Sequence, residues 1–225
     1  DIDTILNNIE LIKNPTKKYL ATSALIRSCI KKRPRGIFAY TGMKYLDGRK
    51  DLTMSIKEHF EQNVILFNNA IFDSKTECKA FNSDFSKMTN KYDLVYIDPP
   101  YFSPLSDNQY VRRYHFVEGL SLNWKSIKIQ EETKTKKFKS YPSAFSKLDS
   151  TISAFKNLIK KYKDSAIVIS YSSNALPKVD FFEEELKKYY ETVQIAEIDY
   201  RYSFSNKTNT NKNKVVEYII LGVNK

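Results

Sequence analysis

Four consecutive residues, Asp98, Pro99, Pro100 and Tyr101, place a carboxylate, two prolines and an aromatic ring directly after an apolar run at residues 94–97. Proline donates no backbone hydrogen bond and fixes φ, so the chain leaves this run in a rigid turn with free carbonyl groups. An exocyclic adenine nitrogen is a poor nucleophile because its lone pair is delocalised into the ring. If Asp98 and the Pro99 carbonyl accept hydrogen bonds from this amino group, the nitrogen becomes more tetrahedral. Its lone pair is then free to attack a methyl donor.

Tyr101 adds an aromatic face to these two acceptors. A base in a duplex reaches such a pocket only after it leaves the stack, and a flipped base is commonly held by aromatic stacking. The simpler interpretation is a strand that ends in a proline-rich turn. A given tetrapeptide with two prolines arises by accident in roughly one chain per thousand of this length, which favours the chemical interpretation.

The strands that must position these groups are indicated by short apolar runs. Residues 94–97 predict a strand buried on both faces of a parallel sheet, and the carboxyl ends of such strands are where α/β sheets bind ligands. Residues 79–84 predict a strand that ends at Asp84. Residues 166–170 predict another buried strand, and residues 193–200 and 215–223 predict a final antiparallel hairpin.

Helical spacing of apolar residues fills most of the remaining chain. It predicts two N-terminal helices that are separated near Pro15, a long helix with one apolar face, and two later helices; the last three cover residues 53–72, 143–162 and 177–190.

The sequence D-P-P-Y after a buried strand resembles the catalytic motif of the N6-adenine DNA methyltransferases, and specifically the Dam-like DNA adenine methylase family. The likeness continues through residues 106–124, 164–177 and 200–204, and it extends upstream to the helices. The resemblance implies an α/β fold with a Rossmann-like, S-adenosylmethionine-dependent methyltransferase sheet that ends in an antiparallel hairpin. It also implies a helical part at the N-terminus.

The resemblance assigns roles to particular residues. It makes Asp98, Pro99, Pro100 and Tyr101 catalytic, and it makes S-adenosylmethionine the cofactor, bound by Asp84, Phe85 and Asp98. For Asp84 the alternative is an ordinary helix N-cap aspartate.

The methyl-donor loop of this family, F-x-G-x-G after a strand, is absent from the sequence. The five glycines stand at positions 36, 42, 48, 119 and 222, and no two of them are two residues apart. The resemblance therefore implies a sheet that lacks its first strands. We expect the chain to be the C-terminal part of a methyltransferase, with residues 1–75 as a helical part for target recognition and residues 76–225 as the catalytic part. An N-terminal fragment or a complementary subunit would carry F-x-G-x-G.

Polar and aromatic residues after the D-P-P-Y motif indicate contacts with nucleic acid. Tyr110, Arg112 and Arg113 combine stacking and phosphate-binding groups. Asn174 follows the strand at residues 166–170, where turn chemistry is the alternative. Arg201 begins a lysine-rich connection that is either a second DNA-facing loop or disorder. Residues 127–139 are also rich in lysine and predict either a solvated loop or a DNA-embracing arm.

Bulk properties agree with a nucleic-acid partner without proving it. The 225 residues carry a formal net charge of +11 and are 41% hydrophobic, enough for one sizeable core. Cys29 and Cys78 are expected to be buried small residues in a reducing compartment. His59 and His115 have no partner at ligand spacing, so no metal is expected; His115 is interpreted as a packed residue or a DNA contact.

The family resemblance implies a DNA adenine N6-methyltransferase of prokaryotic or phage type that acts on double-stranded DNA in a restriction-modification context, and the composition predicts a cytoplasmic protein. The apolar runs are too short for a membrane span, and the acidic N-terminus is not a signal peptide. Two alternatives stay open at this point: a DNA-binding or regulatory half without catalysis, and a cytosine-N4 or RNA methyltransferase.

Overall fold

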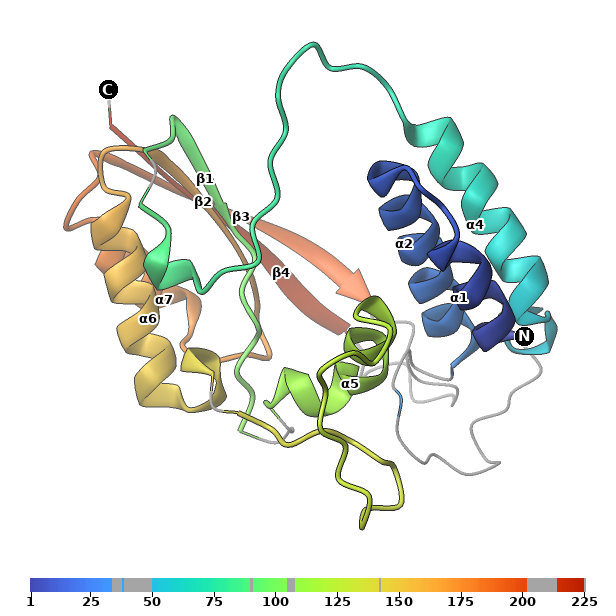
Figure 1. Ribbon diagram of the computed structural model, residues 1–225. Helices are drawn as coiled ribbons and strands as arrows, with labels where there is room; N and C mark the ends of the chain where they lie inside the picture. The colour runs from blue at the N-terminus through green and yellow to red at the C-terminus, as the bar shows by residue number, and fades with distance from the viewer. Residues whose placement is uncertain are drawn as a thin grey trace. The chain divides into compact units, whose positions relative to one another are not determined.

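The structure is a computed structural model that describes residues 1–33, 38, 50–89, 91–104, 108–141, 143–201 and 214–224, with the backbone alone at positions 201 and 214. The chain divides into two compact units (Figure 1). The helical unit comprises Asp1–Lys79 and Val111–Tyr141. The sheet unit comprises Ala80–Tyr110 and Pro142–Lys225.

The helical unit confirms the predicted N-terminal helices. α1 (Ile2–Glu10) and α2 (Pro15–Lys32) are separated at Asn14, whose side chain accepts a hydrogen bond from the Lys17 N–H and caps α2. The same unit also contains α3 (Lys50–Thr53), α4 (Ile56–Ala70) and most of α5 (Tyr110–Ser121). Their core contains Leu6, Ile9, Leu25, Cys29 and Leu120.

α4 is present as predicted, but its most buried side chains are polar rather than apolar. Asn63 donates to the Ser28 hydroxyl at 2.9 Å and accepts from the Arg27 Nε–H at 3.1 Å, which ties α4 to α2. The His59 Nε2 lies 2.8 Å from the Asp51 carbonyl. By contrast, Ile71, an apolar residue of the predicted helix at residues 53–72, is 57% exposed just beyond the end of α4. The helical spacing of apolar residues therefore predicts the helix correctly, but it does not predict which side of the helix is buried.

The sheet unit contains four strands in the order β1-β2-β4-β3. β1 (Leu94–Ile97) is parallel to β2 (Ala166–Ser172), whereas β4 (Lys214–Val223) runs antiparallel both to β2 and to β3 (Thr192–Arg201). The mixed α/β class and the terminal antiparallel hairpin are confirmed. α6 (Leu148–Lys161) and α7 (Val179–Leu186) are shorter than the predicted helices, and short 3₁₀ helices η3 (Phe85–Lys87) and η4 (Ala144–Ser146) occur as well.

One face of the sheet carries the core. Ile167, Ile169 and Tyr171 of β2 are at most 1% exposed and pack in one cluster with residues of α6 and α7. The Phe155 ring of α6 and the Phe182 ring of α7 lie 5.4 and 4.9 Å from the Tyr171 ring. α6 and α7 therefore cover this face, as Figure 1 shows.

The prediction that residues 94–97 are buried on both faces was wrong. Ile97 is 8% exposed on the side of α6, but Leu94 and Tyr96 on the other face are 58% and 57% exposed. β1 lies at the edge of the sheet and pairs only with β2 among the described residues. An apolar run predicts a strand with at least one buried face. It does not show whether a second layer of helices or strands covers the other face.

The predicted strand at residues 79–84 was also wrong. These residues form no strand in the described part of the chain, and they are exposed to solvent. A strand needs a neighbour to pair its backbone groups, and no strand of the described residues pairs with this segment. Cys78, just before it, is exposed rather than buried as expected, whereas Cys29 is buried.

Candidate active site

The D-P-P-Y residues lie where the sequence places them, at the carboxyl end of β1. Asp98, Pro99, Pro100 and Tyr101 line an open cavity of about 440 Å³. Pro99 is buried at the end of the strand, which anchors the turn, whereas Asp98 is exposed to solvent at the cavity. A carboxylate, a rigid carbonyl-rich turn and a phenol ring therefore share one cavity.

Two further residues complete this cavity. Tyr110, a predicted DNA contact, lies at the start of α5 and lines it. Glu217 lines it as well, from β4, and sequence reasoning missed this residue. Alternation along β4 makes Glu217 one of several equivalent positions, so no local signal singles it out.

Tyr101 is held by contacts from two strands. Its hydroxyl lies 3.3 Å from the Ser170 Oγ on β2 and 3.5 Å from a carboxylate oxygen of Glu217. Its ring meets the Tyr171 ring edge-on, with 5.1 Å between centroids. Burial, together with the nearby carboxylates of Glu217 and Asp98, raises the pKa of Tyr101 to about 12. The phenol is therefore neutral at physiological pH and keeps its proton as a hydrogen-bond donor.

The turn after β2 is fixed to the rest of the sheet. The Ser173 N–H donates to the Val216 carbonyl at 2.8 Å, and the Val216 N–H donates to the Ser173 hydroxyl at 3.0 Å. The Tyr171 hydroxyl donates to the Leu176 carbonyl. Asn174 is exposed in this turn, and its DNA contact stays a prediction.

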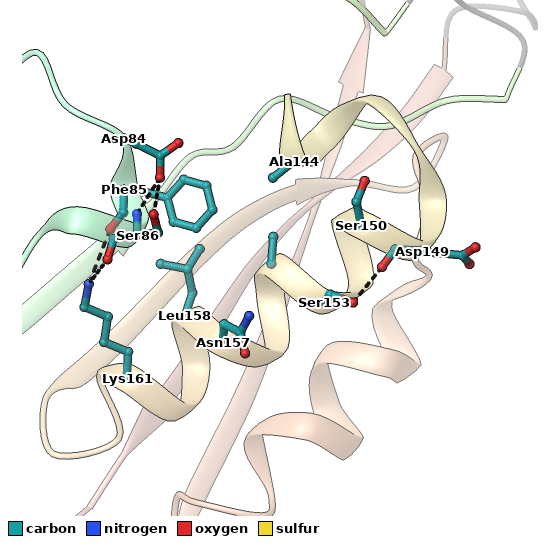
Figure 2. A pocket seen from close by; sticks show the side chains of 11 residues that line it. Asp84, Phe85, Ser86, Ala144, Asp149, Ser150, Ser153, Asn157, Leu158 and Lys161 are labelled. Carbon is teal, nitrogen blue, oxygen red and sulfur yellow. Dashed lines mark hydrogen bonds between the residues drawn. The ribbon is translucent and has the colours of Figure 1, made fainter. Parts of the chain in front are cut away.

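Asp84 and Phe85 line a second cavity of the same unit, of about 560 Å³, between η3 and α6 (Figure 2). Asp84 caps η3: its Oδ1 accepts from the Ser86 hydroxyl at 2.5 Å and from the Ser86 N–H at 2.8 Å. These hydrogen bonds, that of the hydroxyl first, lower the pKa of the Asp84 carboxyl. Both bonds go to one oxygen, so the ionised carboxylate keeps its other oxygen for a further donor.

The turn that carries Asp84 is tethered to α6. The Lys161 ammonium donates to the Ser86 carbonyl at 3.0 Å and to the Phe85 carbonyl at 3.4 Å, as Figure 2 shows. The Phe85 ring also packs against the Phe145 ring at 5.5 Å. The N-cap alternative for Asp84 is therefore realised, and it is compatible with a ligand role because it uses only Oδ1.

The remaining predictions concern residues of the helical unit or residues outside the described part of the chain. Arg112 and Arg113 belong to the helical unit, at the start of α5, and their DNA contacts stay predictions. His115 is 4% exposed, and its Nδ1 lies 3.1 Å from the Arg112 carbonyl, so it is a packed residue. The side chain of Arg201 and the connection at residues 202–213 lie outside the described residues, as do residues 105–107.

The described residues form neither a metal-binding cluster nor a membrane-spanning helix. Within them, no three His, Cys, Asp or Glu side chains gather in a way that would hold a metal ion. In the same residues, every helix is too short or too polar to cross a bilayer.

Comparisons with known proteins relate most of the chain to one family. A sequence model described as D12 class N6 adenine-specific DNA methyltransferase matches residues 7–204. The chain is 24% identical over 236 residues to the type II methyltransferase M2.HphI of Haemophilus parahaemolyticus, which covers 98% of the chain and 66% of that protein.

Two further relatives share a shorter region. The chain is 30% identical over 150 residues to the modification methylase StsI of Streptococcus sanguinis, and 30% identical over 145 residues to the type II methyltransferase M.FokI of Planomicrobium okeanokoites. These matches cover 65% and 63% of the chain but 22% of each relative, so the chain spans only part of the relatives it matches. No solved structure matches the chain.

Proposed function

We propose, from the premise that this chain belongs to the D12 class N6 adenine-specific DNA methyltransferase family, that it transfers a methyl group to the N6 nitrogen of an adenine in double-stranded DNA. Family membership confirms the resemblance to the Dam-like methylases. The observation that carries the proposal is the cavity at the end of β1, which contains Asp98, the two prolines and Tyr101. The names of the relatives favour a restriction-modification context.

In the proposed mechanism, the Asp98 carboxylate and the Pro99 carbonyl accept the two hydrogen bonds of the target amino group. This geometry draws the nitrogen towards a tetrahedral form and directs its lone pair at the methyl carbon. S-adenosylmethionine, which Asp84 and Phe85 would hold, would supply that carbon as the methyl group of a sulfonium and would depart as a neutral thioether. The methylated nitrogen then releases one proton, which the Asp98 carboxylate can accept and pass to water because Asp98 is exposed at the cavity.

Tyr101 is proposed to hold the target base. The adenine must leave the duplex to reach Asp98, and an aromatic face offsets part of the cost of unstacking. Since the hydroxyl and the ring edge of Tyr101 are both in contact with β2, its ring is fixed before the base arrives.

Asp84 and Phe85 are proposed to bind S-adenosylmethionine in the cavity beside α6. The ionised Asp84 carboxylate fits the amino group of the cofactor adenine, because its Oδ1 is engaged by Ser86 and Oδ2 can accept. Phe85 adds an apolar side to the same cavity. Asp98 is also proposed to contact S-adenosylmethionine, as the family resemblance implies.

The open edge of β1 is the proposed docking site for the strands and the F-x-G-x-G loop that the family resemblance requires. Leu94 and Tyr96 expose apolar surface beside backbone groups that have no ladder partner on that side among the described residues. Exposed edges of this kind pair readily with a further strand. The occupant is a glycine-loop-bearing segment of the complete protein or a complementary subunit.

The proposal is tested with the complete methyltransferase, tritiated S-adenosylmethionine and genomic DNA, which presents adenine in many sequence contexts. Asp98→Ala should reduce methyl transfer by roughly a hundredfold or more and leave the Kd for DNA nearly unchanged. Asp93→Ala, just before β1, is the matched control, since Asp93 lies outside the cavity. Full turnover by Asp98→Ala would overturn the assignment.

Identification of the product separates the remaining alternatives. Nuclease digestion and mass spectrometry of the modified DNA should yield N6-methyladenine. N4-methylcytosine, or methylation of RNA alone, would instead indicate a different substrate. DNA binding without any methylation would indicate a binding or regulatory half.

A further inference from the structure

Glu217 is a second carboxylate at the cavity of the D-P-P-Y turn, and neither the motif nor the family resemblance assigns it a role. It comes from β4, more than a hundred residues after Asp98, and is half-buried. A carboxylate in a partly buried position is costly unless its hydrogen bonds are made. The hydrogen bonds of the Glu217 carboxylate beside Tyr101 therefore need to be identified.

The strand register brings Glu217 to Tyr101. Glu217 on β4 pairs with Ser172 on β2, and Ser170 lies two residues earlier on the same strand. Residues that alternate along a strand share a face, so Ser170 and Glu217 point to the same side of the sheet. The Tyr101 hydroxyl lies over this side, 3.3 Å from Ser170 and 3.5 Å from Glu217.

The chemistry of the three groups fixes the direction of the hydrogen bonds. An ionised carboxylate only accepts, so the Tyr101 O–H donates to Glu217, and the Tyr101 oxygen is then left to accept from the Ser170 hydroxyl. Both distances are longer than usual for O–H···O bonds. Such bonds in catalytic sites often shorten only when the substrate is bound.

We propose that Glu217, together with Ser170, is a positioning residue for Tyr101: it fixes the hydroxyl so that the ring keeps one orientation in the cavity. This inference rests on the proposed function. A tyrosine that is free to turn would lose that freedom when a base stacks on it, whereas a tethered ring loses little, so the tether favours capture of the flipped base.

A double-mutant cycle distinguishes this role from a direct one. If Glu217 acts through the Tyr101 hydroxyl, Tyr101→Phe and Glu217→Gln should each slow single-turnover methyl transfer roughly tenfold, the size expected for one hydrogen bond to a charged group. The double variant should then be no slower than Tyr101→Phe alone. Additive losses would mean that Glu217 contacts the substrate itself, and a Glu217→Gln rate equal to wild type would mean that it has no role; either result overturns the proposal.

A matched control and a second readout complete the experiment. Glu197→Gln changes an exposed glutamate on the neighbouring strand, which pairs with Tyr218 and so faces the opposite side of the sheet; its rate should be that of wild type. The KM for S-adenosylmethionine should be unchanged in Glu217→Gln, because the Tyr101 hydroxyl that Glu217 contacts is assigned to the target base and not to the cofactor. A raised KM with an unchanged rate would contradict the proposed role.

Urea unfolding of the same four proteins separates failure of this inference from failure of the proposed function. A coupling between Tyr101 and Glu217 in the free energy of unfolding reports their contact without DNA or cofactor. If the wild-type enzyme methylates DNA but neither cycle shows coupling, the positioning role is wrong. If the stability cycle shows coupling but no methylation occurs with any substrate, the proposed function fails while the contact stands.

Discussion

At the scale of single residues, burial decides which side chains can react. Tyr101 illustrates this, because burial keeps its hydroxyl protonated far above physiological pH and so preserves the donor on which its contacts depend. The same physical effect acts on Cys29 and His115 in the helical unit, with consequences that can be measured without any substrate.

The two cysteines should differ sharply in reactivity. Cys29 is 2% exposed and burial raises its pKa to about 11, so little thiolate forms, whereas Cys78 is exposed. We expect a disulfide reagent such as Ellman's to titrate one thiol of the native protein rapidly and the second only after denaturation. Cys78→Ser should abolish the rapid phase, and two rapid equivalents in the wild-type protein would contradict the buried position of Cys29.

His115 should make stability depend on pH. Burial, assisted by the nearby Lys137, lowers its pKa in the folded state, so the unfolded chain binds a proton that the folded chain does not. The stability present above about pH 6.5 is therefore lost as the pH falls below that value. Urea unfolding at pH 7.5 and pH 5.5 should show this loss, and His115→Gln should reduce it. An equal loss in His115→Gln would assign the effect to other groups.

At the scale of elements, α4 begins with a capping box whose contribution can be isolated. The Ser55 hydroxyl accepts from the Glu58 N–H at 3.1 Å, and the Glu58 carboxylate accepts from the Ser55 N–H at 2.7 Å. Ser55→Ala should lower the free energy of unfolding by about 1 kcal/mol, measured by urea denaturation, because a helix donor loses its partner. Ser55→Asn, which keeps a capping oxygen, should cost much less; an equal loss would show that the cap is not the cause.

The tether between α6 and η3 yields a prediction for cofactor binding. Lys161→Met removes the donor to the Ser86 and Phe85 carbonyls, so the turn that carries Asp84 becomes less well positioned. We expect the KM for S-adenosylmethionine to rise about fivefold, as for one lost hydrogen bond, with kcat unchanged. Lys160→Met, at the neighbouring position on α6, is the control. A fall in kcat at constant KM would contradict a role confined to the cofactor cavity.

The elements also show how far the sequence could be interpreted. Local signals were sufficient for the helices, for the position of β1 before Asp98, and for the terminal hairpin, because period and turn chemistry are properties of neighbouring residues. They failed at residues 79–84, where apolar residues without a pairing strand remain exposed. They failed equally at Leu94 and Tyr96, since a second covering layer is not a local property.

The candidate site shows the same division. Asp98 to Tyr101 are contiguous, so their shared cavity followed from the motif and the end of the strand. Glu217 reaches the cavity only through the register of β4 against β2, a pairing between distant parts of the chain that composition and spacing do not encode.

At the scale of the whole molecule, the net charge of +11 predicts that the proposed binding to DNA weakens as the salt concentration rises. Each phosphate contact that releases a counterion contributes about −0.9 to the slope of log K against log salt concentration. Lys128 and Lys139 are exposed and flank the bridge between Ile129 and Phe138 in the lysine-rich segment at residues 127–139. Because the bridge is antiparallel, Lys128 and Lys139 are the next residues outward on its two sides, and their positive charges lie next to each other.

The double variant Lys128→Gln, Lys139→Gln tests whether this segment embraces DNA. If both lysines contact phosphates, fluorescence anisotropy at several salt concentrations should show a slope shallower by about two, with weaker binding to every sequence alike. Lys187→Gln is the control, because the Lys187 ammonium is already paired with the Glu183 carboxylate at 2.5 Å. An unchanged slope would make the segment a solvated loop, and a loss confined to one DNA sequence would indicate that it reads bases rather than phosphates.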